Sequence, residues 1–243
     1  MFFKQSENTV EFFTEVESLL DTPPIPANKF YPSWFKNMPP GHDVPVGKGF
    51  PFGLSKQLRL SNVNATIKRC PGVISYLSTG WIIPLWSDFV VQVRQGSIYA
   101  FGSNETAYVS MHSRERHFHT MPEIEGYYPE PLKFTNPWKV LTPPGYSVLL
   151  CAPFYHLEQR FTVVPGVIDS DTYHHMHVNT FFKNKVGDYN LKMNMPFLQV
   201  IPFKRTSIEA DIRIATDEDK KRLAKLKFKS DRFFGKNKSM QES

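Results

Sequence analysis

Residues 142–205 read TPPGYSVLLCAPFYHLEQRFTVVPGVIDSDTYHHMHVNTFFKNKVGDYNLKMNMPFLQVIPFKR, and this stretch decides the fold. Several short runs in it alternate apolar and polar residues, and turn residues separate the runs. The runs that we interpret as strands are 146–152, 161–165, 176–182 and 197–203. Short strands at such intervals are typical of an antiparallel sandwich or barrel.

The sequence upstream of this stretch continues the same pattern. Further candidate strands are 63–69, 80–94 with a break at Pro84, 97–101, 106–111 and 137–142. Residues 9–20 fit a short helix and a hairpin strand equally well. Downstream, Thr216 is a candidate N-cap for a helix over 217–228, with acidic residues in its first turn and basic residues in its last. The sequence therefore predicts a mainly β barrel or sandwich with a C-terminal basic helix.

Residues 23–53 alternate prolines with aromatic residues and show no period. Proline lacks the amide donor and disfavours helix in the residue before it, so a long helix is excluded. We expect an extended arm whose aromatic side chains dock on the domain or on a neighbouring subunit; these are Phe30, Tyr31, Trp34 and Phe35. The predicted domains are an arm over 1–57, a β core over 58–205 and a basic tail over 206–243.

The composition supports a β-rich fold and indicates in which cellular compartment the protein occurs. Of 243 residues, 21 are Phe, which favours strands, and 20 Pro against 13 Gly indicate many chain reversals. The two cysteines, Cys70 and Cys151, lack a CxxC partner, which excludes a zinc ribbon and indicates buried free thiols. The N-terminus lacks the features of a signal peptide, and no apolar run has membrane-spanning length. We expect an intracellular protein, or one carried inside something assembled intracellularly, without a membrane partner.

The formal net charge is +6, and basic residues gather between Lys204 and Lys238. A basic tail can bind nucleic acid by neutralising phosphates, although a solvated helix face is the simpler explanation.

Residues 142–205 carry a resemblance to a known family. Pro144 and Gly145 form a turn motif, GVIDSD (166–171) is followed by Tyr173, and NMPFLQ (194–199) ends the stretch. In this order the motifs resemble the β-barrel core of trimeric dUTPases and the related dCTP deaminases. Asn194 stands where that family has a turn glycine, and Asn tolerates the left-handed conformation.

The resemblance implies a set of roles. Asp169 would be the catalytic carboxylate that orients water, and Tyr173 would lie beneath a deoxyribose. The other implied ligand-binding residues are Gly166, Asp171 and Gln199. It also implies a nucleotide ligand, magnesium on the phosphates, and a homo-oligomer, namely a trimer with its sites between subunits.

The sequence also departs from the family's pattern. APFYHL (152–157) replaces the phosphate-binding motif with its arginine and serine, and Thr172 is an extra residue before Tyr173. Three histidines, His174, His175 and His177, lie where a glycine admits the base. We therefore predict a retained fold that binds a nucleotide-type ligand or a host partner without ordinary dUTP hydrolysis. GVIDSD also fits a plain β-turn whose aspartates bond backbone amides.

Two alternatives to this function remain. FYPSWFKNMPP (30–40) and KFTNPWKVLTPPGYS (133–147) resemble a group of phage-encoded proteins, which suggests a viral origin and admits a virion structural or assembly protein. His117 and His119, followed by Glu123, resemble the first metal motif of cupins. On a strand the two imidazoles would share one face and suit an iron or zinc centre; histidines in a polar loop are the other interpretation.

Overall fold

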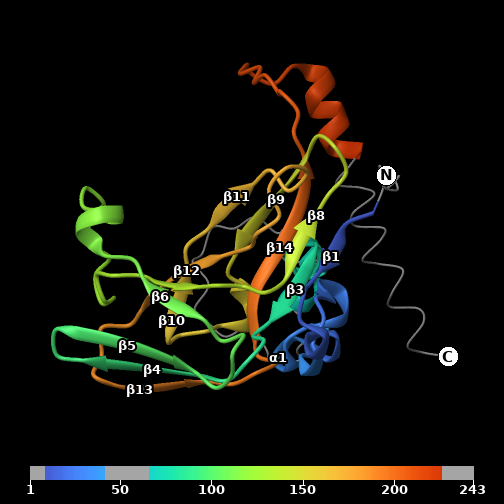
Figure 1. Ribbon diagram of the computed structural model, residues 1–243. Helices are drawn as coiled ribbons and strands as arrows, with labels where there is room; N and C mark the ends of the chain where they lie inside the picture. Colours follow the sequence, from blue (N-terminus) through green and yellow to red (C-terminus); the bar gives the residue numbers. More distant parts are fainter. Residues whose placement is uncertain (1–8, 42–65, 226–243) are drawn as a thin grey trace. The chain divides into compact units, whose positions relative to one another are not determined.

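The computed structural model describes residues 9–41 and 66–225 (Figure 1). Of these, 9–36 and 75–205 form one compact unit, and the other described residues belong to a second unit. The first unit contains several sheets of antiparallel strands, so the predicted mainly β fold is confirmed.

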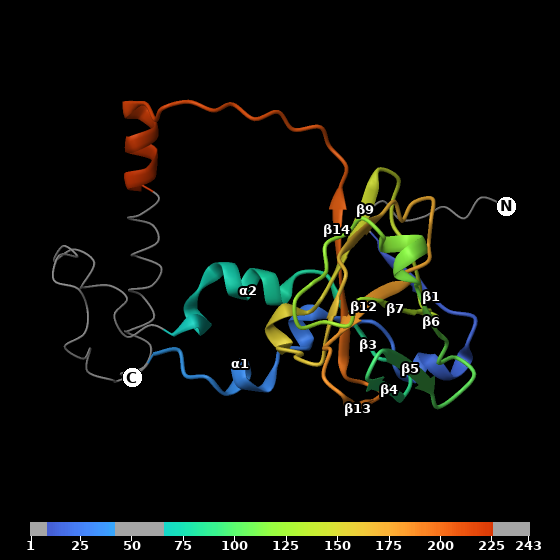
Figure 2. The same cartoon turned by 90° about the vertical axis from the view of Figure 1, so that its left-hand side faces the viewer.

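The largest sheet has five strands in the order β11-β9-β14-β3-β2. Their bounds are β2 (Ile25–Pro26), β3 (Trp81–Pro84), β9 (Tyr146–Cys151), β11 (Gly166–Ile168) and β14 (Pro196–Lys204). The central strand β14 runs beside β9 in both views (Figure 1, Figure 2). Val148 pairs with Ile168 on one side and with Pro202 on the other. One end of this sheet therefore brings together the end of β11, the start of β9 and the end of β14.

Three smaller sheets complete this unit. One has the order β10-β12-β7-β6, the second β13-β4-β5, and the third pairs β1 with β8. Their bounds are β1 (Glu11–Phe13), β4 (Phe89–Arg94), β5 (Ser97–Gly102), β6 (Val109–Met111), β7 (Leu132–Phe134), β8 (Lys139–Leu141), β10 (Phe161–Val163), β12 (Val178–Phe182) and β13 (Gly187–Leu191).

Buried aromatic rings fill the core of this unit. Phe134 is fully buried, and its ring lies 5.1 Å, centroid to centroid, from both Phe89 and Phe197. Phe161 and Phe182 extend the cluster. Tilted and edge-to-face arrangements of this kind are favourable for aromatic pairs. The phenylalanines therefore account for how short strands form a stable core.

Two predicted turns have the expected backbone. Gly145 has φ +80° and lies in a turn closed by the bond from the Tyr146 amide to the Pro143 carbonyl, 3.1 Å. Asn194 has φ +69°, as expected for an asparagine in place of a turn glycine. These turns fix where β9 and β14 begin.

The prediction of a strand over 63–69 is wrong for its described part. Residues 67–69 form a 3-10 turn, η3 (Ile67–Arg69), and α2 (Pro71–Ser78) follows; 63–65 lie outside the described residues. Proline at the first helical position favours this helix start, because its missing amide would have no partner there. Cys70, expected to be buried, is exposed; both cysteines are free thiols.

Other differences come from short or polar elements. Residues 9–20 form β1 and most of the 3-10 turn η1 (Glu17–Asp21). The prediction lacked β7, which has only three residues, β11, which lies inside the motif 166–171, and β13, whose sequence GDYNL is mostly polar. None of these strands offers enough alternation to be recognised.

Residues 23–36 of the aromatic arm belong to the first unit and pack within it. It contains β2 and two short helical turns, η2 (Ala27–Lys29) and α1 (Ser33–Asn37). Phe35 is 3% exposed, and the Trp34 indole Nε1 donates to the Tyr155 carbonyl at 2.8 Å. The predicted boundary between residues 57 and 58 lies outside the described residues.

In the second unit, residues 217–225 are helical, and the predicted N-cap is present. The Asp219 amide donates to the Thr216 hydroxyl at 3.3 Å, and the Asp219 carboxylate accepts from the Thr216 amide at 2.8 Å. This reciprocal pair is a capping box. Within the described ranges, no helix is both long enough and apolar enough to span a bilayer.

Candidate functional site

The predicted motif GVIDSD forms the whole of β11 and the tight turn that follows it. The amides of Thr172 and Tyr173 both donate to the Asp169 carbonyl at 2.9 Å. The Asp171 carboxylate accepts from the Gly145 amide at 2.8 Å, which joins this turn to the turn before β9. The Asp169 carboxylate instead accepts from the Ser147 hydroxyl at 2.6 Å. The β-turn interpretation is thus right for the turn and for Asp171, which bonds a backbone amide, but wrong for Asp169, which bonds a serine hydroxyl.

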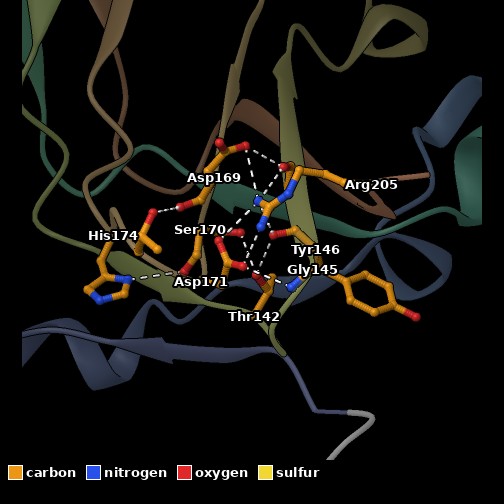
Figure 3. A network of polar contacts seen from close by, with 10 residues as sticks. Thr142, Gly145, Tyr146, Asp169, Ser170, Asp171, His174 and Arg205 are labelled. Atoms are coloured by element: carbon orange, nitrogen blue, oxygen red, sulfur yellow. Dashed lines mark hydrogen bonds and ion pairs between the residues drawn. The ribbon is translucent and has the colours of Figure 1, made fainter. Parts of the chain in front are cut away.

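Arg205 closes this acidic turn (Figure 3). It follows β14 directly, and its amide donates to the Gly145 carbonyl at 2.8 Å. Its guanidinium bonds both oxygens of Asp171, through Nη1 at 3.0 Å and through Nη2. Nη1 also lies 3.1 Å from Asp169 Oδ1 and donates to the Ser147 hydroxyl at 3.0 Å. A two-pronged contact of this kind is the strong form of an arginine–carboxylate pair.

The charges of the turn are set by this pairing. The guanidinium of Arg205 and then the Gly145 amide hold the pKa of Asp171 below its usual range. In return, Asp171 raises the pKa of Arg205. The side chain of Asp171 is 11% exposed, whereas that of Asp169 is 60% exposed. Asp171 is therefore an ionised, largely covered partner of the arginine, and Asp169 is an exposed one.

A buried hydroxyl pair lies beneath the two aspartates. Ser170 and Thr142 are both fully buried, and their hydroxyl oxygens are 2.7 Å apart. Thr142 donates to the Tyr146 carbonyl at 3.2 Å, so Ser170 is the donor within the pair. The Nδ1 of His174 lies 3.1 Å from the Ser170 carbonyl and 3.2 Å from the Val140 carbonyl. Because carbonyls only accept, Nδ1 is the protonated ring nitrogen.

The turn does not fit a magnesium ion. Both Asp171 oxygens bond Arg205, and Asp169 Oδ1 is shared by Ser147 and Arg205. Magnesium is bound by carboxylates that are free to coordinate it, usually together with substrate phosphates. Over the described residues, no group of three or more histidine, cysteine or acidic side chains could hold a metal. In this arrangement the carboxylates stabilise the turn.

The other predicted ligand-binding residues are spread over three places. Gly166 lies on β11, and an added Cβ there would meet nothing within 4 Å. Tyr173 is 50% exposed, and its ring lies 5.6 Å from that of His175. Gln199 is 2% exposed and donates from Nε2 to the carbonyls of Tyr76 at 3.2 Å and Thr79 at 2.9 Å. Gln199 therefore satisfies carbonyls at the end of α2.

Gln199 also lines a small cavity beneath the arm. The cavity has about 10 Å³, room for one water molecule. Tyr76 borders it, and burial raises the pKa of that phenol to about 12. Its other lining residues are Ala27, Phe30, Leu77, Ile82, Pro153, Tyr155 and His156. A nucleotide would not fit in a space of this size.

The cupin-like interpretation is wrong about its local structure. His117 lies in the π-helical turn η4 (Arg114–Phe118), and His119 is its C-cap, so the two imidazoles do not share a strand face. The His117 ring stacks on His112, with centroids 4.4 Å apart. Glu123 lies 3.8 Å from Arg114. The helical turn forms because the Ser113 hydroxyl caps it by accepting from the Arg116 amide.

Sequence reasoning missed Arg205, Ser147 and Thr142. Arg205 lies 34 residues from Asp171 in the chain, and its neighbour Lys204 is equally basic. Only the pairing of β14 with β9 brings Arg205 beside the turn. No spacing in the sequence carries that information.

The fold and the site together define an antiparallel β protein whose acidic turn is closed by an arginine. No protein-family model and no curated protein matches the chain. Solved structures that are similar in fold are dUTPases, the family whose motifs 142–205 resemble. The dUTPase of EIAV has a TM-score of 0.32 and 12% identity, over 56% of this chain and 83% of that one.

Two structures of the dUTPase of phage phi11 of S. aureus are similar as well. One has a TM-score of 0.30 and 10% identity, over 57% of this chain and 84% of that one. The other is a mutant described as coordinating a structural Mg(II) ion, with a TM-score of 0.32 and 10% identity, over 57% and 85%.

Proposed function

We propose that this chain is a phage-encoded protein that uses a dUTPase-like core to bind a nucleotide-type ligand, without ordinary dUTP hydrolysis. The observation that carries the proposal is the engagement of both aspartates by Arg205. A general base must reach a water molecule with a free lone pair. Asp171 already accepts three bonds, from Arg205 and from the Gly145 amide, and its side chain is only 11% exposed. Asp169 shares Oδ1 between the Ser147 hydroxyl and Arg205, which leaves Oδ2 as its open oxygen.

The segment that replaces the family's phosphate motif supports the loss of hydrolysis. Phe154–His156 forms a 3-10 turn, η5, with Phe154 66% exposed. Leu157 follows with φ +57°. Neither an arginine nor a serine occurs in this segment, so it offers no side-chain donor of the kind that holds a triphosphate.

The partners follow from the same reasoning. The ligand is a nucleotide-type molecule of the host cytoplasm, and a triphosphate would bring its own magnesium because the acidic turn does not supply a site. Tyr173, His175 and His177 offer aromatic rings beside the turn. Binding to a host protein instead would need no free nucleotide.

Two assays test the proposal together. With dUTP and magnesium, the purified chain should release no pyrophosphate above background. In thermal-shift experiments, nucleotides with and without magnesium should raise the melting temperature, because a ligand of the native state stabilises it. Turnover of dUTP would refute the first half, and no shift with any nucleotide or oligonucleotide would refute the second.

A second candidate function, a virion or assembly protein, is favoured by one observation in the second unit. Residues 206–214 belong to no helix or strand, and Ile208, Ile212 and Ile214 are 86%, 95% and 93% exposed. With Ala210 they make alternate residues apolar, the pattern of a strand with one buried face. Such a segment would gain stability by covering that face on a neighbouring subunit.

This candidate has its own test. The chain should occur in purified particles by mass spectrometry, and light scattering should show an oligomer, for which a trimer is the expectation. The substitution Ile212→Lys should dissociate it, whereas Glu209→Lys on the opposite face should not. A monomeric wild-type chain that is absent from particles would refute this candidate.

A further inference from the structure

A diagonal strip of rings crosses the outer face of the sheet β10-β12-β7-β6. Before and within β12, the buried residues Met176, Val178 and Thr180 alternate with outward-facing His175, His177 and Asn179. Tyr173 continues the outward row by one more step. The ring of His175 lies 5.6 Å from Tyr173 and 5.1 Å from His177. Three adjacent rings thus form a continuous ladder.

Lys133 lies next to this ladder on the neighbouring strand. It is the Cα partner of Asn179 on β12 and of Ser110 on β6, so its side chain shares their face. Together with burial, which is the larger cause, the positive charge of Lys133 lowers the pKa of both His177 and His112. None of the ion pairs found among the described residues includes Lys133.

A second ring pair lies on the far side of Lys133. His112 follows β6, and His117 from η4 stacks on it at 4.4 Å with an interplanar angle of 16°. Phe118, next in the chain, covers Phe181 at 5.9 Å. Across this face, Lys133 therefore lies between the ring pair of His112 and His117 and the ladder of three rings. Along the chain the strip extends from Phe181 on β12 back to Tyr173 beside the acidic turn.

Two histidines of this strip, His112 and His177, have a pKa below the usual value, which favours their neutral form. Burial, then His117 and Lys133, lower the pKa of His112 below its usual value. Burial, then Lys133 and His175, do the same for His177. An uncharged imidazole presents a flat face to a base without repelling the lysine. Glu15 lies beside His175 and pairs with Lys139 at 2.8 Å.

We propose that this strip binds single-stranded nucleic acid, with bases stacked on the rings and a backbone phosphate on Lys133. The proposal rests on the nucleotide-type ligand proposed above and specifies its class. Base stacking on aromatic side chains together with basic groups along the backbone is how single strands are bound without sequence readout. A strip of this length exceeds one nucleotide, so a polymer uses it better than a monomer.

The test is fluorescence anisotropy with labelled 12-mers of dT and of U, using the full chain. Both should bind saturably, and each should bind more tightly than dTMP or inorganic phosphate. Tyr173→Ala and His175→Ala should each weaken binding roughly 5- to 100-fold, the value of one stacked base. Lys133→Ala should weaken it and reduce the slope of log affinity against log salt by about 1. Glu15→Gln should strengthen it about twofold, because a nearby negative charge is removed.

Matched controls separate the strip from the basic tail, which all variants retain. Tyr99, 52% exposed on β5 of another sheet, is a comparable tyrosine, and Lys185 is a comparable exposed lysine. Tyr99→Ala and Lys185→Ala should bind like the wild type. Circular dichroism melts should show that Tyr173→Ala folds as the wild type does.

The outcomes are distinct. Wild-type affinity in Tyr173→Ala and His175→Ala, or an equal loss in Tyr99→Ala, would refute the proposed binding strip. Stabilisation by mononucleotides without any binding of 12-mers would refute the binding of single-stranded nucleic acid by the strip but would agree with the proposed function. Failure of every nucleotide and oligonucleotide would overturn both.

Discussion

The buried hydroxyl pair beneath the acidic turn gives a sharp prediction about stability. Ser170→Ala removes the donor to Thr142 but leaves the bond from Thr142 to the Tyr146 carbonyl intact. The net value of one such bond is about 1 kcal/mol. Thr142→Val keeps the shape of the side chain but leaves the Ser170 hydroxyl buried without an acceptor. An unsatisfied buried group costs about 2 kcal/mol, so this substitution should cost more.

These free energies translate into measurable shifts. For a domain of this size, 1 kcal/mol lowers the melting temperature by about 3 °C. We expect a loss of about 3 °C for Ser170→Ala and about 6 °C for Thr142→Val. Urea unfolding should give matching changes in the midpoint at an unchanged slope.

The double variant decides whether the two hydroxyls act on each other. With both removed, no polar group is left unpaired, because the Tyr146 carbonyl still accepts from Arg205 at 3.0 Å. The double variant should therefore be no less stable than Thr142→Val alone. Additive losses, or a larger loss for Ser170→Ala than for Thr142→Val, would refute this account of the turn.

Three further substitutions test the acidic turn and the backbone at two glycines. Arg205→Gln should lower stability at neutral pH and make the loss of stability below pH 4 less steep. In the wild type, the lowered pKa of Asp171 contributes stability that is complete above the ordinary value of 3.8. This contribution is lost as pH falls through the folded-state value. Melting temperatures from pH 7 to 2 measure this, and an unchanged acid slope would contradict it. Gly96→Ala should cost about 1 kcal/mol, since Gly96 has φ +74° and open space around it. Gly80→Ala, with φ +72° and a Cβ 2.0 Å from the Val200 carbonyl oxygen, should cost about 3 kcal/mol or more; equal losses would show that the contact is relieved cheaply.

The pairing of Arg205 with two aspartates changes how the motif 166–171 is understood. The same residues can belong to a catalytic site or to a structural joint, and the choice depends on what faces them. Here the partner is a cation fixed by its own backbone bond to Gly145. These contacts connect the end of β14 to the turns before β9 and after β11. Keeping the charges of Arg205, Asp169 and Asp171 would therefore stabilise the fold.

Four of the six strands in 142–205 follow from the sequence alone, namely β9, β10, β12 and β14, and so do the turns at Gly145 and Asn194. Alternation of apolar and polar residues is a local property, and so is the left-handed backbone that Gly145 and Asn194 adopt. The cap at Thr216 is equally local, because its partner Asp219 is three residues away. For such features, the residues that interact are close enough in the chain to be recognised together.

Only the tertiary structure decided which side chains meet. Strand register brings Arg205 to Asp171 and turns Gln199 toward α2, and it aligns Lys133 between two sets of rings. Each of these contacts depends on several strand pairings at once, and shifting any one by a single residue would turn its side chains to the other face. The sequence fixes no such register locally, so the chemistry of the site had to be taken from the folded chain.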